Sequence, residues 1–75
     1  MILLTIPPIS RSGRIDLETD SVLTLSHASD IELLEGVAQA VLANRYKIEL
    51  SFGTQFESDA VAQRVLDYLA SKNIT

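Results

Sequence analysis

The sequence predicts an α+β domain, a two-layer sandwich in which a small mixed sheet of three to four strands carries two helices on one face. Short segments with strand-like alternation occur near the N-terminus and at residues 46–52, and residues 29–44 and 55–72 have helical spacing. Both helical segments begin with a capping-box pattern. The expected order of elements is ββ(β)αβα. A chain of 75 residues can close only one hydrophobic core, so residues 1–75 are expected to form a single domain.

The N-terminal segment Ile2–Ile6 alternates as a strand does, with apolar residues on both of its faces. Such a strand is expected in the middle of a sheet or at an interface, paired within its own sheet or with a second copy of the chain. Pro7 and Pro8 lack the amide N–H that a strand needs and end it. Residues 7–13 are expected to form a loop with Arg11 near its tip.

The segment Arg14–Glu18 alternates polar with apolar residues, which predicts a half-buried strand near an edge of the sheet. Thr19–Ser21 is polar and predicts a turn. Val22–Ser26 then predicts the next strand, which would pair with the preceding one as a hairpin.

The pattern at Ser29–Glu32 predicts the start of the first helix, because the Ser29 hydroxyl can cap the Glu32 amide and the Glu32 carboxylate can return the bond. Apolar residues continue at helical spacing, and Asn44 is a reasonable end. Gly36 falls inside this predicted helix, where glycine costs about 1 kcal/mol relative to alanine. Close packing of the helix against the sheet is the expected reason for it.

The segment Tyr46–Phe52 has the clearest alternation in the chain and predicts a strand with one buried face. Gly53 ends that strand, and Thr54–Glu57 repeats the capping-box pattern. A second helix is therefore expected at Gln55–Lys72, and Ile74 and Thr75 are expected to form a frayed tail.

Strands at Val22–Ser26 and Tyr46–Phe52, joined by one helix, would be parallel, with both carboxyl ends at the same edge of the sheet. The N-termini of both helices would meet there and offer free amides to a small anion or a carbonyl compound. Alternatively, these residues are only helix caps, a turn glycine and a solvated histidine. The predicted ligand-binding residues are Ser26, His27, Ser29, Gly53 and Thr54.

Catalytic and metal-binding patterns are not found in the sequence. The chain has one histidine and no cysteine, and its acidic residues show no spacing that would pair two carboxylates in a cleft. Ser26 adjoins His27, but neighbouring strand residues point to opposite faces. The sequence therefore predicts a protein that is not an enzyme and holds no cofactor or metal.

Ten acidic residues against six basic ones give a formal net charge of −4, which disfavours nucleic acids and anionic membranes as partners. The apolar N-terminal segment is too short for a signal peptide or a membrane span, so a cytoplasmic location is expected. Met1 favours a natural start of the chain. The small basic cluster Arg11–Arg14 can dock on an acidic protein or have no role.

Aliphatic residues are more abundant than one thin core needs, since 47% of the chain is hydrophobic. Some of this surface is expected to contact a protein partner. The sequence predicts a non-catalytic interaction module that acts as a small regulator, adaptor or stoichiometric inhibitor of a larger protein, or that forms a homo-oligomer. The alternative is a domain that senses a small ligand or anion. The predicted partner-binding residues are Ile2, Leu3, Leu4, Arg11, Arg14, Lys47 and Glu49.

Overall fold

The computed structural model describes residues 1–5, 13–53 and 55–74, which form four strands and two helices. The predicted loop at residues 7–13 lies outside the described residues except for Gly13. In chain order the elements are β1 (Ile2–Thr5), β2 (Arg14–Thr19), α1 (Leu25–Glu32), β3 (Val37–Asn44), β4 (Lys47–Phe52) and α2 (Ser58–Ser71).

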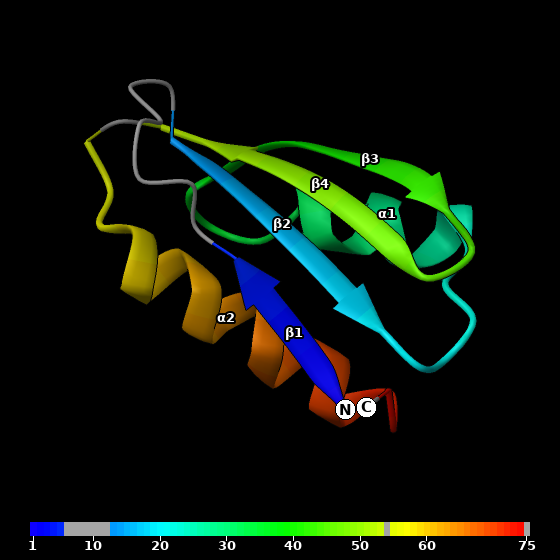
Figure 1. Cartoon of the computed structure of the whole chain (residues 1–75). Coiled ribbons are helices and arrows are strands. Elements are labelled where there is room, and N and C mark those ends of the chain that lie inside the picture. Colours follow the sequence, from blue (N-terminus) through cyan, green and yellow to red (C-terminus); the bar gives the residue numbers. More distant parts are fainter. Residues whose placement is uncertain (6–12, 54, 75) are drawn as a thin grey trace.

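The strands form one sheet of order β1-β2-β4-β3, and both helices cover the same face of it (Figure 1). The predicted α+β class and the two-layer arrangement are confirmed. The sequence predicted a mixed sheet, and this is wrong, because every neighbouring pair of strands is antiparallel. The order of elements is ββαββα, because a strand replaces part of the first predicted helix.

The core lies between the sheet and the helices. In β2 and β4 every second side chain is buried, which matches the alternation in the sequence. These side chains meet the apolar faces of α1 and α2. The largest fully buried side chains are Ile15, Leu17, Ile31, Ile48, Leu50, Val61, Val65 and Leu69.

The strand predicted at Val22–Ser26 does not form. Residues 22–24 are a connection, and α1 begins at Leu25, four residues before the predicted start. The N-cap is Thr24, whose hydroxyl oxygen accepts from the amide N–H of His27 at 3.4 Å. Ser29 therefore lies inside the helix rather than at its cap.

The predicted helix at residues 29–44 is wrong beyond Glu32. A turn follows α1, and Val37–Asn44 is β3, the edge strand next to β4. Gly36 lies in that turn with φ +94°, a backbone conformation that favours glycine. A Cβ atom there would approach Val61 Cγ2 to 3.0 Å, so the glycine also permits close packing against α2.

Two further expectations about the strands change. The first strand lies at an edge of the sheet rather than in its middle, and it pairs within this sheet, one of the two expected alternatives, in a continuous register with β2 from Ile2 and Thr19 to Thr5 and Asp16. As a result β2 is an interior strand, between β1 and β4, rather than an edge strand. Its charged side chains point to the open face of the sheet and not to an edge.

The second helix begins at Ser58 with Glu57 as N-cap, and Glu57 makes no side-chain cap hydrogen bond. Thr54 lies outside the described residues. At the other end Asn73 has φ 60°, and the Ile74 amide donates to the Leu69 carbonyl at 3.0 Å. This is a Schellman cap. Ile74 packs into the core instead of fraying.

Candidate interaction surface

The predicted ligand site is not assembled in the fold. The segment before α1 lies beside the β3–β4 turn, where the Leu23 amide donates to the Arg45 carbonyl at 2.6 Å. Gly53 lies beyond the other end of β4, where its amide donates to the Gly36 carbonyl at 3.1 Å. The two predicted halves are thus separated by the length of β4, about 20 Å for six residues. The parallel crossover that would have joined them does not exist.

His27 and its neighbours stabilise α1. The His27 Nδ1 atom accepts from the Thr24 amide at 3.1 Å, which makes His27 the second half of a capping box. Ser26 and Ser29 are exposed on the same helix. The alternative interpretation took Ser29 as a cap and His27 as a solvated histidine, whereas in the structure Ser29 lies within α1 and His27 belongs to the capping box.

Metal ligands are not gathered at any point of residues 1–5, 13–53 and 55–74, where no group of three or more His, Asp or Glu side chains could hold an ion. Neither of the two helices in the described ranges is long and apolar enough to cross a membrane.

Tyr68 and Asp30 connect the two helices. The Tyr68 hydroxyl donates to Asp30 Oδ2 at 2.7 Å in a partly buried position. Burial raises the pKa of Tyr68 to about 12, and the hydrogen bond to Asp30 and the negative charge of that carboxylate add to the rise. The pair is a structural link, since it holds α1 against α2 beneath the sheet.

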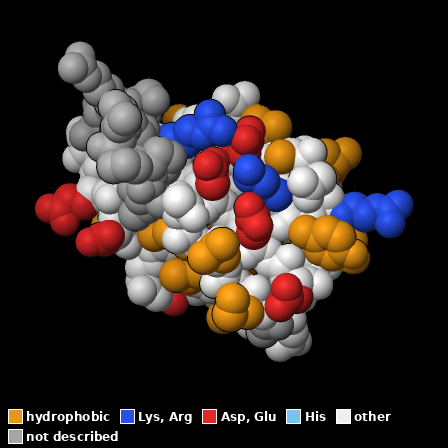
Figure 2. Space-filling model, in the orientation of Figure 1, with side chains coloured by type: hydrophobic (Ala, Val, Ile, Leu, Met, Phe, Trp, Pro, Cys, Tyr) orange, Lys and Arg blue, Asp and Glu red, His pale blue; other side chains and the backbone are white. Residues whose placement is uncertain are grey.

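The open face of the sheet carries charges of both signs (Figure 2). Asp16 of β2 and Glu49 of β4 lie directly opposite each other. Arg14 joins them, with its Nη2 atom 2.8 Å from Glu49 and its Nε atom 3.3 Å from Asp16. Two carboxylates in opposed positions repel, so the guanidinium offsets a destabilising pair.

Lys47 lies opposite Glu18 on the same face, and both line an open depression with Asn44 and Tyr46. The predicted partner residues Arg14, Lys47 and Glu49 therefore share one surface. Arg11 lies outside the described residues. The face as a whole is closely balanced in charge, and its exposed ion pairs contribute little to stability.

The two edges of the sheet differ in how they are protected. At β3 the Ala40 amide points outward and donates to the Glu32 carboxylate at 3.0 Å. The register between β3 and β4 also shifts near both ends of the strand, which bends the edge. A bound carboxylate and irregular register both hinder a further strand from pairing there.

In the part of the chain that the structure describes, the β1 edge has neither a bound carboxylate nor a shift of register. The Thr19 amide donates to Tyr46 at 2.9 Å, away from β1, so Thr19 and its partner Ile2 are not hydrogen-bonded to each other. By alternation the N–H and C=O groups of Ile2 and Leu4 point out of the sheet. Within the described ranges, no hydrogen bond reaches these outward groups. We call this row the β1 edge.

Apolar side chains accompany the β1 edge. Leu3 is on the open face and 52% exposed, and Met1 is exposed beside it. In Figure 2 apolar side chains lie over the β1 end of the face, next to acidic side chains. Predicted partner residues Ile2, Leu3 and Leu4 all lie in this strand.

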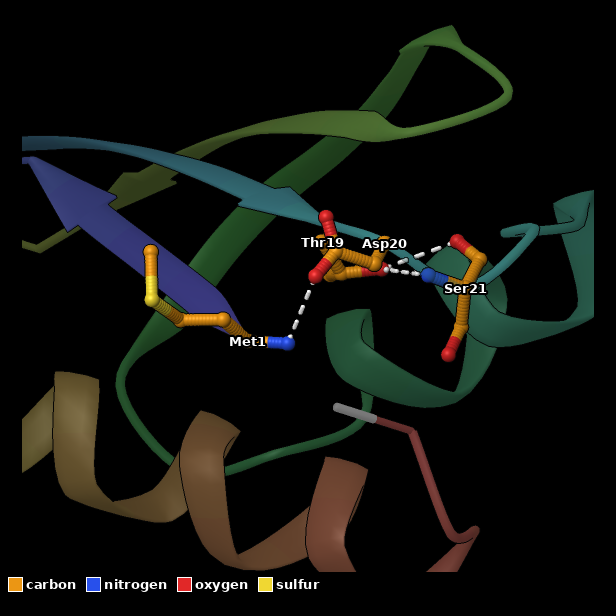
Figure 3. A network of polar contacts seen from close by, with 4 residues as sticks. All are labelled: Met1, Thr19, Asp20 and Ser21. Carbon is orange, nitrogen blue, oxygen red and sulfur yellow. Dashed lines mark hydrogen bonds and ion pairs between the residues drawn. The ribbon is translucent and has the colours of Figure 1, made fainter.

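The start of β1 is joined to the end of β2. The amino group of Met1 is 2.8 Å from the Asp20 carboxylate, and next to it Thr19 and Ser21 form a tight turn (Figure 3). Both partners of the ion pair are highly exposed, so its contribution to stability is small.

Glu32 makes a contact that the sequence interpretation missed. Its carboxylate was expected to cap its own helix, and it instead protects β3. No sequence signal could identify that contact while Val37–Asn44 was interpreted as helix. Asp16, in contrast, could be placed beside Arg14 from the alternation of β2.

Over the described residues, the fold and this surface define a small α+β domain with an open sheet face and one unprotected edge. Comparisons of the chain with protein-family models, curated proteins and solved structures find no match.

Proposed function

We propose that the chain is a non-catalytic protein–protein interaction module whose β1 edge accepts an extended segment of a protein partner. Strand addition of this kind uses main-chain hydrogen bonds for affinity and side-chain contacts for specificity. The single observation that supports it is the contrast between the edges: β3 is protected by Glu32, whereas the outward groups of Ile2 and Leu4 have no hydrogen-bond partner among the described residues. In this role the domain serves as a regulator, adaptor or stoichiometric inhibitor.

The neighbouring open face contributes specificity. A strand added to β1 would lie beside Leu3, with Glu18 next along the row on β2. An apolar side chain facing Leu3 is thus favoured in the partner. The alternative function, sensing a small ligand at paired helix N-termini, has no assembled site to support it.

The test places a photoreactive benzoylphenylalanine at Leu3 and, as a matched control, at Val41. Both side chains are about half exposed, and both are on the open face at opposite edges. Irradiation in native cell extract should give protein adducts at position 3 in clear excess over position 41. Equal adduct yields at the two positions, or none at either, would contradict the proposed function.

A further inference from the structure

The β1 edge is complementary to a second copy of itself. Its outward groups belong to Ile2 and Leu4, two residues apart. If a second β1 approaches antiparallel, Ile2 of each copy lies opposite Leu4 of the other. Residues in that register exchange both N–H···O=C bonds, so every outward donor and acceptor of the two strands is satisfied.

The same register places Leu3 of one copy directly opposite Leu3 of the other. Opposed residues of antiparallel strands lie on the same face, and these two form a pair without mutual hydrogen bonds, with Cα atoms about 4.5 Å apart. Leu3 is half exposed in the single chain. Pairing would cover both leucines with each other.

Charge also favours contact through this edge. Residues 24–36 and 53–74 contain six acidic and two basic side chains, so they account for the whole formal net charge of −4. These segments hold the helices. Two copies repel through their helical layers, whereas β1 has no charged side chain.

From these observations we infer that the partner of the β1 edge is a second copy of the chain. The two β1 strands pair antiparallel about a two-fold axis through Leu3, and the two sheets become one. This inference rests on the proposed function. A contact made by a four-residue strand is smaller than a stable dimer needs, so the dimer is weak and concentration-dependent.

A cysteine at position 3 tests the register directly, because the chain has no native cysteine. Opposed Cα atoms at about 4.5 Å are within the range that a disulfide spans. Under mild oxidation Leu3→Cys should form a disulfide-linked dimer much faster than Val41→Cys, its control at the β3 edge. Circular dichroism of both reduced variants establishes that they fold alike.

Light scattering of the unchanged chain should show a mass that rises from 8.2 kDa toward twice that value with concentration. Amide exchange should slow at Ile2 and Leu4 over the same range and stay unchanged at Ala40. Faster cross-linking at position 41, or a monomer at every concentration, would overturn the self-pairing. Adducts to other proteins at position 3 would, in that case, still support the interaction module, so the two failures are distinguishable.

Discussion

Replacing Gly36 by alanine has opposite effects on the free energy of unfolding in a helix and in a turn. In a helix interior, Gly36→Ala would stabilise the fold, because alanine is the better helix former. In the turn after α1, with φ +94° and Val61 close by, the substitution should cost at least about 1 kcal/mol. Urea denaturation monitored by circular dichroism measures the difference. A more stable variant would contradict the turn and restore the helix that the sequence predicted.

Tyr68 makes stability depend on pH in the alkaline range. Its pKa is raised from 10.0 to about 12 in the folded chain, so the stability linked to the protonated hydroxyl is complete below pH 10 and falls as the pH approaches 12. Tyr68→Phe should remove this dependence and cost about 1 kcal/mol at neutral pH through the lost hydrogen bond.

The ionisation of Tyr68 can be followed directly in a variant with one tyrosine. Tyr46→Phe leaves Tyr68 as the only phenol, whose ultraviolet absorbance reports ionisation. Adding Asp30→Asn should lower the pKa of Tyr68, because the negative charge is removed while the burial remains. An unchanged midpoint in the double variant would show that Asp30 does not contribute.

At the scale of single elements, the position at which α1 begins decides whether Thr24 or Ser29 caps the helix. Thr24→Ala should cost about 1 kcal/mol, because Thr24 caps the helix and pairs with His27. Ser29→Ala should be neutral or slightly stabilising, since Ser29 is exposed within the helix. Thermal unfolding of both variants makes the comparison. If Ser29→Ala were the more destabilising variant, the helix would begin at the predicted capping box instead.

Much of the architecture could be predicted because the apolar residues of its elements repeat with one clear period. β4 and β2 bury alternate residues, and α2 has one apolar stripe, so their positions follow from hydrophobic pattern alone. Val37–Asn44 has no such pattern. Six of its eight residues, at 37, 38, 40, 41, 42 and 43, are Ala, Val or Leu and fit a helix as well as a strand, and its two register shifts break the alternation.

The candidate surface was predicted in part. The strand expected at Ile2–Ile6 was placed in the middle of a sheet or at an interface, and β1 lies at an edge. The ligand cluster failed because it depended on the parallel crossover, and one misassigned segment removed that crossover. A site built from distant segments is lost when any one connection is wrong, whereas a site within one strand survives.

At the scale of the whole molecule, the separation of charge predicts how salt affects self-association. Two copies carry −4 each, located in the helical segments, while the proposed contact contains no ion pair. The Debye length falls from about 30 Å at 0.01 M salt to about 10 Å at 0.1 M, so salt should screen the repulsion and strengthen the dimer. Sedimentation equilibrium at both salt concentrations measures the dissociation constant. Glu35→Gln, which removes one exposed charge from the α1–β3 turn, should reduce the salt effect. A dimer that salt weakens would require ion pairs across the contact and would therefore exclude β1 as the interface.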